Sequence, residues 1–273
     1  MRASLAGVAA FAFVFGTSCI YLTGVQDYEK GACEGPCTDA ATDGDTAADS
    51  ASPCPSGMVL VAGGSYVPVS KPGGGLVRIE ALCVDATEVT AAAYKVCVLS
   101  GTCTAVASKP LCNYGTDGRE NDPINCVDVT QAKAYCASLA KRLPTDDEWE
   151  WVARGGPLGF AYPWGNAAPT AADDPEHLCW QGKTKRDDET VWSKRPAGTC
   201  AVSTFPRGAR DGMSDLAGNV SEWTSTTDGT KFVYRGGSAF DLADPALFKV
   251  GDRRSAASAS YPSIGVRCFA SPR

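Results

Sequence analysis

Two stretches early in the folded part of the chain have the hydrophobic patterns of β-strands. The run "MVLVAGGSYV" at 58–67 predicts a strand, a Gly-Gly turn and the start of a second strand. The run "LCVDATEVT" at 82–90 alternates apolar and polar side chains and predicts another strand. We therefore expect the folded part to open with a β-rich region.

Two later stretches change to the spacing of amphipathic helices. The stretch at 90–101 begins at a capping residue, Thr90, and ends at Gly101. A second helix is predicted over "DVTQAKAYCASLA" at 128–140. The residues expected on the inward faces are Ala93, Val96 and Cys97 in the first helix and Ala134, Tyr135, Cys136 and Leu139 in the second.

A third helix is predicted over "LPTDDEWEWVARGG" at 143–156, which carries its own boundary signals. Thr145 and Glu148 have the spacing of a capping box, and Gly155 suits the position that ends the helix. The rest of the chain has turn signals at "YPWGN", "DLAGN" and "YRGGS". With 29 glycines and 17 prolines among 273 residues, this pattern predicts one loop-rich α+β domain over 57–273.

Charge is unevenly distributed along the chain. Seven acidic residues and one lysine lie in the stretch 19–57, whose charge of −6 equals the formal net charge of the whole chain. The run "TDAATDGDTAADSASP" within it has no aromatic residue, so we expect 19–56 to form a disordered acidic tether. The nearly neutral remainder lacks the basic footprint of a nucleic-acid-binding protein.

The first residues have the pattern of an export signal. Arg2 precedes an apolar run at 5–15 that is too short to span a membrane. Three small residues then lead into Cys19, as in a bacterial lipobox, although leucine is usual where Gly16 stands. We expect 1–18 to be a lipoprotein signal peptide and Cys19 to be acylated, which would anchor the protein to the membrane of the cell envelope. The alternative is ordinary secretion.

The cysteine content indicates disulfides. Of thirteen cysteines, twelve remain once Cys19 is assigned to the lipid, and an even set in an exported chain favours a disulfide framework. A zinc site is disfavoured because the only histidine is His177. Proximity in the sequence suggests the pairs Cys33–Cys37, Cys54–Cys83, Cys97–Cys103, Cys112–Cys126 and Cys179–Cys200.

Seven blocks, taken in order, resemble the sulfatase-modifying-factor domain of formylglycine-generating enzymes. They are "MVLVAGGSY", "DATEVTAAAY", "PINCVDVTQAKAYCASLAKRLPTDDEWEWVARGG", "YPWGN", "DLAGNVSEW", "YRGGS" and "IGVRCF". The resemblance covers nearly all of the folded part and implies an irregular, C-type-lectin-like α+β fold. It also implies a disulfide between the "AYC" helix and the terminal strand, which here is Cys136–Cys268.

The resemblance marks one clear departure. Active members of this family bind copper(I) through two cysteines that follow the Gly-Gly-Ser turn, because soft thiolates suit that ion. The matching positions here are Asp241 and Ala246, so we expect no copper and no copper-dependent formylglycine synthesis.

Other positions of the family's pocket are kept in part. Ser238 and Arg254 match it, whereas Ser221 replaces an aromatic residue at the pocket floor. Ser263 stands, in a looser alignment, where the family has an asparagine. We expect a pocket whose chemistry is lost or changed.

The resemblance further implies a structural calcium site made of hard oxygen ligands. Its matching positions are Asp215, Gly218, Val220 and Glu222, with Asn219 shaping the turn. The alternative is an Asx-type turn with a solvated Glu222. A second calcium site of the family does not carry over, because Leu178 stands at a ligand position beside Cys179.

We interpret the chain as a ligand-binding or accessory module whose partner is an unidentified ligand or exported protein. The alternative is an oxidoreductase that uses a different site, as in relatives associated with non-haem iron. Such an iron site usually needs two histidines, and His177 is alone. For the same reason Ser238 has no second histidine to activate it as a nucleophile.

Overall fold

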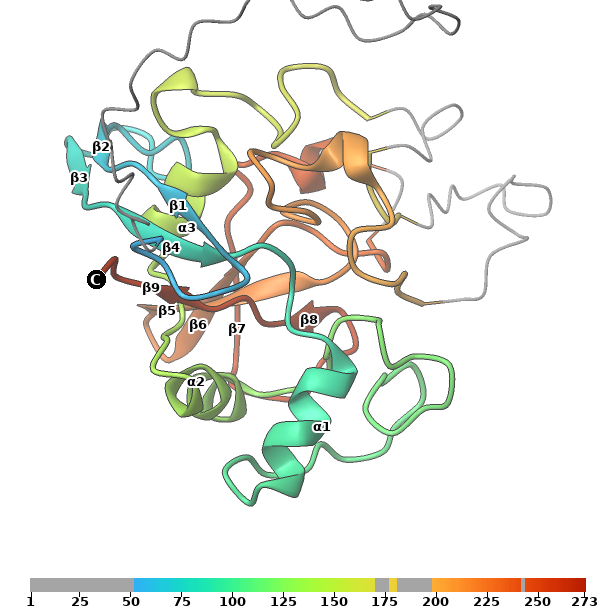
Figure 1. Ribbon diagram of the computed structural model, residues 1–273. Coiled ribbons are helices and arrows are strands. Elements are labelled where there is room, and N and C mark those ends of the chain that lie inside the picture. The colour runs from blue at the N-terminus through green and yellow to red at the C-terminus, as the bar shows by residue number, and fades with distance from the viewer. Residues whose placement is uncertain (1–51, 170–176, 181–197, 242–243) are drawn as a thin grey trace, which may run out of the picture. The chain divides into compact units, whose positions relative to one another are not determined.

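The computed structural model describes residues 52–169, 177–180, 198–241 and 244–273 (Figure 1). The predicted signal peptide, the acylation site Cys19, most of the tether and the Cys33–Cys37 pair lie outside the described residues. Cys54 is buried and bonded to Cys83, so the folded part begins a few residues before 57. None of the helices within these ranges is long and apolar enough to cross a membrane.

The first sheet joins the start of the folded part to its final strand. Its order is β1 (Met58–Val61), β4 (Leu82–Asp85) and β9 (Phe269–Ala270), and both pairings are antiparallel. The predicted second strand ends at Asp85, and the first three residues of β4 are all buried rather than alternating. They are buried because both faces of the strand are covered: Leu82 and Val84 pack in the cluster that contains Trp151, and Cys83 packs with Cys54.

The predicted strand–turn–strand unit at 58–67 is confirmed, but its two strands belong to different sheets. β2 (Gly64–Tyr66) pairs with β3 (Val77–Ile79) in a separate antiparallel ribbon. Trp151 packs under this ribbon, with its ring centroid 5.4 Å from that of Tyr66. The Gly-Gly turn therefore carries the chain from one sheet to the next.

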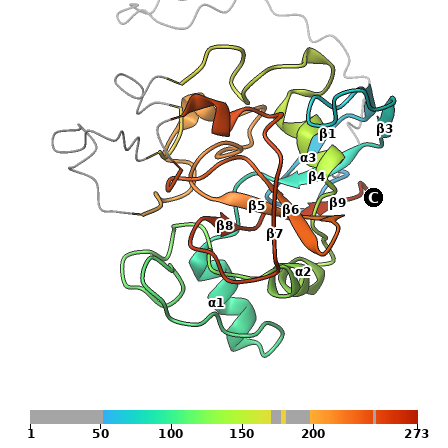
Figure 2. The same cartoon turned by 180° about the vertical axis from the view of Figure 1, so that it is seen from behind.

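The third sheet carries the residues of the candidate site. Its order is β7 (Arg254–Ala256), β6 (Lys231–Arg235), β5 (Ser221–Asp228) and β8 (Ile264–Gly265) (Figure 2). The β5–β8 pair is parallel and the others are antiparallel. Trp223 on β5 is fully buried and donates its indole N–H to the Val127 carbonyl at 2.9 Å, which joins the sheet to the segment just before the second helix.

All three predicted helices are present, and α1 and α2 lie together at one end of the described region (Figure 1). Thr90 caps α1 (Ala91–Leu99), and Thr145 forms the predicted capping box with Glu148. The remaining elements are α2 (Val129–Ser138), α3 (Asp146–Ala153) and the short 3-10 turns η1 (Gly156–Leu158), η3 (Pro206–Gly208) and η4 (Pro245–Phe248).

The predicted inward faces of α1 and α2 are only partly right. Cys97, Tyr135 and Cys136 are buried as expected, but the side chains of Val96 and Leu139 are 67% and 49% exposed, and Ala134 is exposed as well. Tyr94 takes the inward place instead: its ring stacks on that of Tyr135, with centroids 5.5 Å apart. The contact between the two helices, rather than the apolar pattern of each one, sets their orientation.

Five disulfides lie within the described residues. Cys136–Cys268, which the family resemblance implied, is present with a Cα–Cα distance of 5.5 Å. The pairs Cys54–Cys83, Cys97–Cys103, Cys112–Cys126 and Cys179–Cys200 are confirmed as well. Every cysteine within the described ranges is therefore bonded to another.

Candidate functional site

The turn that follows β6 positions the first residue of the family pocket. Gly237 has a φ of +69°, and a Cβ atom there would lie 2.7 Å from the Leu247 carbonyl oxygen. Only glycine fits this close, left-handed position. The turn places Ser238 in the interior with 1% of its surface exposed.

Asp241, which the family resemblance matches to the first copper thiolate, is held in place by its neighbours. Ser238 donates its backbone N–H to Asp241 Oδ2 at 2.7 Å and its hydroxyl to the same oxygen at 3.0 Å. Arg254 donates to both carboxylate oxygens, at 2.8 and 3.3 Å. Trp180 donates its indole N–H to the Asp241 carbonyl at 3.2 Å. The structure thus brings together three of the predicted pocket residues.

Arg254 lies between two carboxylates in this group. Its Nε is 2.8 Å from Asp252 Oδ2, and its guanidinium carbon lies 5.3 Å from the centroid of the Tyr234 ring. Burial lowers the pKa of the Arg254 guanidinium, but the hydrogen bonds and charge of Asp241 outweigh burial and raise that pKa above its ordinary value. Arg254 is therefore a fixed cation with its carboxylate partners already in place.

The other pocket positions do not join this group. Ala246 is exposed on η4, where its N–H donates to Asp244 Oδ1 at 2.9 Å. Ser221 is buried on β5 and donates its backbone N–H to the Ser263 carbonyl at 2.9 Å. Ser221 and Ser263 are therefore joined by a backbone hydrogen bond just before β8, and neither is hydrogen-bonded to the Ser238, Asp241 and Arg254 side chains.

The chemistry available in the described part of the chain is that of ion pairs and hydrogen bonds. No group of three or more His, Cys, Asp and Glu side chains within these residues is arranged to hold a metal ion. His177 is half-buried, with its ring centroid 5.0 Å from that of Trp164. The Ser238–Asp241–Arg254 group can bind a polar ligand by exchanging these contacts, but it offers no thiolate.

The two predicted calcium carboxylates are both buried. Asp215 is 4% exposed and accepts the Ser203 backbone N–H at 2.6 Å. Glu222 is 1% exposed and accepts the Trp149 indole N–H at 2.7 Å and Arg267 Nε at 2.8 Å. The alternative of a solvated Glu222 is therefore wrong.

Glu88 is a further buried acid that the sequence analysis missed. Its carboxylate accepts Asn219 Nδ2 at 2.7 Å and the Val220 backbone N–H at 3.1 Å. Burial, followed by repulsion from Asp215, raises the pKa of Glu88 well above its ordinary value. The only signal in the sequence was that Glu88 lies in the "DATEVTAAAY" block of the family resemblance. An acid is seldom buried without a partner, and the sequence around Glu88 did not reveal one.

Arg267 pairs directly with Glu222, and the charges of Glu88 and Asp215 act on the same buried guanidinium. Burial is the first cause that raises the pKa values of Asp215 and Glu222, while the charge of Arg267 lowers both. If all three acids were ionised, the group would carry two negative charges in excess. A divalent cation would offset that excess, and the proposed ligands are all oxygens, which suits calcium. The donor set therefore suits calcium in its oxygen chemistry and charge, but both Glu222 oxygens already accept hydrogen bonds, and the described carboxylates do not form a ready-made group of three metal ligands.

The loop that carries these residues is braced by the Cys179–Cys200 disulfide. Asn219 donates its backbone N–H to the Cys179 carbonyl at 2.9 Å and accepts the Cys200 N–H at 3.0 Å. Gly218 has a φ of +82°, and a Cβ there would lie 2.8 Å from the Cys179 carbonyl oxygen. Leu178 beside this bridge is fully buried among apolar side chains.

Comparison with curated proteins finds several relatives. The chain is 36% identical over 157 residues to inactive C-alpha-formylglycine-generating enzyme 2 of Bos taurus, a match that covers 54% of this chain and 49% of that protein. It is 40% identical over 108 residues to the formylglycine-generating enzyme of Thermomonospora curvata, covering 38% and 33% of the two chains. It is also 36% identical over 110 residues to hercynine oxygenase of Mycolicibacterium smegmatis, covering 39% and 22%. The chain thus spans half or less of the length of these relatives.

Solved structures share the fold over most of the chain. Treponema denticola variable protein 1 superimposes with a TM-score of 0.59 at 18% identity, over 79% of this chain and 95% of its own. PvdO from Pseudomonas aeruginosa gives 0.56 at 22% identity, over 78% and 93%. These neighbours and the mixed helix and sheet content confirm the predicted α+β fold of the formylglycine-generating enzyme type.

The sequence itself matches a described domain family. Residues 44–272 match the sulfatase-modifying factor enzyme 1-like domain, which is most of the 273-residue chain. The seven ordered blocks lie within this match. The chain therefore belongs to the sulfatase-modifying factor enzyme 1-like domain family.

Proposed function

We propose that this protein is a lipid-anchored component of the bacterial cell envelope. Its domain binds a ligand or an exported partner protein and does not carry out copper-dependent formylglycine synthesis. The main observation against copper-dependent synthesis is the set of hydrogen bonds that the Asp241 carboxylate makes. This carboxylate occupies the position of a copper thiolate and is bonded to Ser238 and Arg254.

Two further observations support the loss of copper chemistry. Ala246, at the second thiolate position, is an exposed methyl group on η4. The ten cysteines of the described residues are all in disulfides, and a bridged sulfur neither ligates copper nor attacks a substrate. The likeness to proteins named inactive C-alpha-formylglycine-generating enzyme 2 points in the same direction.

The Ser238–Asp241–Arg254 group is the proposed ligand contact. Arg254 and Asp241 have 24% and 18% of their side-chain surface exposed, so solvent reaches both partners of the pair. A ligand with its own carboxylate or guanidinium would exchange with one of them. Without a catalytic thiol or a second histidine, this contact recognises a ligand rather than transforms it.

Calcium is the proposed structural cofactor. The side chains of Asp215 and Glu222 and the carbonyl groups of Gly218 and Val220 would hold the ion. Calcium would supply positive charge to a buried cluster that has more carboxylates than guanidinium groups. Bound to calcium, these residues would hold the loop that leads into β5 in one conformation.

The likeness to hercynine oxygenase favours the second candidate, an oxidoreductase with a different site. The composition speaks against it, because a mononuclear iron site usually uses two histidines and the chain has one. Metal analysis of the purified protein separates the candidates: calcium alone supports the proposal, and stoichiometric iron or copper contradicts it.

The decisive test is conversion of a peptide that contains the sulfatase cysteine motif. The copper-loaded protein is incubated with peptide and reductant, and an active formylglycine-generating enzyme serves as the positive control. We expect mass spectrometry to find unmodified peptide with this protein and product with the control. Formylglycine made by this protein would overturn the proposal.

The lipid anchor is tested separately by replacing Cys19 with serine. The wild-type protein is expected in the membrane fraction of the producing cells, and Cys19→Ser in the soluble fraction. Equal fractionation of both forms as soluble protein would refute the anchor and favour ordinary secretion.

A further inference from the structure

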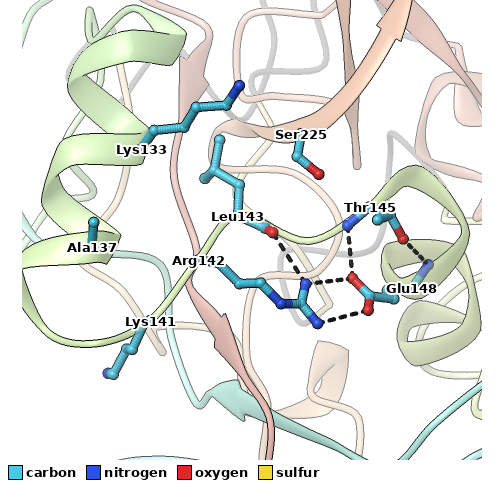
Figure 3. Close-up of a pocket in the computed structure, with 8 residues that line it drawn as sticks. All are labelled: Lys133, Ala137, Lys141, Arg142, Leu143, Thr145, Glu148 and Ser225. Atoms are coloured by element: carbon cyan, nitrogen blue, oxygen red, sulfur yellow. Dashed lines mark hydrogen bonds and ion pairs between the residues drawn. The ribbon is translucent and has the colours of Figure 1, made fainter.

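A cavity of about 400 Å³ lies between α2 and the start of α3, away from the Ser238 and Asp215 groups (Figure 3). Its walls come from α2, from the segment that follows α2, from α3 and from β5. The residues that matter here are Lys133, Ala137, Arg142, Leu143, Thr145 and Ser225. The volume is in the range of pockets that hold small ligands.

The cavity is preformed because each wall is fixed by covalent or hydrogen bonds. Cys136–Cys268 ties α2 to the terminal strand. Arg142 and Phe269 exchange two backbone hydrogen bonds of 2.8 Å each. The Ser225 N–H donates to the Pro144 carbonyl at 2.7 Å, which fixes β5 against the segment before α3. A ligand would therefore enter without a cost for ordering the walls.

The charges around the cavity leave one cation without a carboxylate. Arg142 forms a bidentate pair with Glu148 at 2.6 and 2.7 Å, and Lys141 pairs with Asp85 at 2.5 Å. None of the ion pairs among the described residues involves Lys133, whose Nζ lies 4.9 Å from the centroid of the Phe232 ring. Figure 3 shows its side chain running from α2 past Leu143. The rim thus offers a positive charge to a ligand.

Part of the cavity lining is apolar and can contact a hydrocarbon group of a ligand. The accessible apolar lining includes Ala137, an exposed methyl group on α2, whereas Leu143 beside it is almost completely buried. The Ser225 hydroxyl donates to the Pro144 carbonyl at 3.0 Å, so its proton is already used within the protein and Lys133 remains as the cationic donor at the rim. An apolar body with one anionic end matches this combination of floor and rim.

We infer that this cavity binds a small organic carboxylate, with the apolar body over Ala137 and Leu143 and the carboxylate at Lys133. The inference is independent of the proposed function, because neither the Ser238 group nor the calcium positions line this cavity. A carboxylate is favoured over a neutral ligand because it supplies the negative partner that Lys133 does not have among the ion pairs of the described residues.

The test is a titration of the isotope-labelled, oxidised protein with hexanoate and, as a neutral control, hexanamide, followed by NMR. We expect hexanoate to shift the backbone amides of Ala137, Leu143 and Ser225 with a saturable, millimolar affinity. Lys133→Gln should weaken hexanoate roughly two- to fivefold, the range for an exposed ion pair, and leave hexanamide unchanged. Lys95→Gln on α1 is the matched control and should change neither.

A second variant tests the floor of the cavity. Ala137→Leu fills the space with a good helix former, and it should abolish saturable binding of both probes. The inference is overturned if hexanamide binds the wild type as tightly as hexanoate, or if Lys133→Gln and Lys95→Gln behave alike. It is also overturned if the shifts fail to saturate or lie outside this cavity. Lys133 is exposed, so the first variant keeps the test decisive even if Ala137→Leu perturbs folding.

Discussion

Removal of the Cys136–Cys268 disulfide should cost far more stability than removal of Cys97–Cys103. The first bridge joins residues 132 positions apart, and the second joins residues only 6 apart. In the chain-entropy relation, the stabilisation grows with the logarithm of the loop that the bridge closes in the unfolded chain. That relation gives about 5 kcal/mol for the long loop and about 2 kcal/mol for the short one.

The comparison is well matched because all four cysteines are buried. Cys136 and Cys268 are fully buried, and Cys97 and Cys103 are 8% and 7% exposed, so replacing either pair with alanines leaves a similar small void. The difference of about 3 kcal/mol between the two variants therefore reports mainly on the unfolded chain.

The assay is equilibrium unfolding in urea, followed by the fluorescence of Trp149, Trp151 and Trp223, which are buried. Loss of the long bridge should also raise the dependence of the unfolding free energy on urea, because the unfolded chain becomes more expanded. Equal losses of stability in the two double variants would refute the reasoning. So would a larger loss for Cys97→Ala with Cys103→Ala.

Three further predictions concern the sites. Calcium at about 100 times its dissociation constant should raise the melting temperature of the wild type by about 5–10 °C. It should leave the melting temperature of Asp215→Asn unchanged. The prediction is contradicted if calorimetry gives the wild type the same melting temperature with chelator as with calcium. Asp241→Asn should lower the free energy of unfolding by about 2 kcal/mol, because it weakens the charged hydrogen bonds from Ser238 and Arg254; an unchanged urea midpoint would argue against that pair. Burial raises the pKa of Glu148, but bonds from Arg142 and Thr145 outweigh burial and hold that pKa below 4.5. The stability advantage of the wild type over Glu148→Gln should therefore be present above pH 4.5 and vanish as the pH falls through the lowered pKa; an advantage that persists in acid would disprove this origin.

The features that could be predicted from the sequence are those set by a few adjacent residues. The capping box of Thr145 and Glu148 depends on a spacing of three residues, so it can be recognised locally. The Gly-Gly turn before Ser238 is local in the same sense. Asp241 and Ala246 could be placed only through the family resemblance, because nothing in their own neighbourhood indicates a lost thiolate.

The features that could not be predicted depend on residues that are distant in sequence. Glu150 on α3 binds Arg235 on β6 at 2.8 Å, across 85 residues. Neither segment shows that its charge is buried, because the partner is supplied by the tertiary fold. Val96 was misplaced for the same reason: it fits an apolar stripe on α1, but the neighbouring helix packs against Tyr94. Propensity and pattern describe an element, whereas packing decides its orientation.

The location of β8 and β9 has a consequence for the order of folding. β8 pairs with β5, β9 pairs with the central strand β4, and Arg267 between them is the cation of the buried acidic cluster. A nascent chain that stops short of Ile264 would leave two sheets without a strand and three acids without their counter-charge. The core therefore closes only after synthesis has passed this point. Such long-range pairing gives a high contact order, for which slow, late folding is expected.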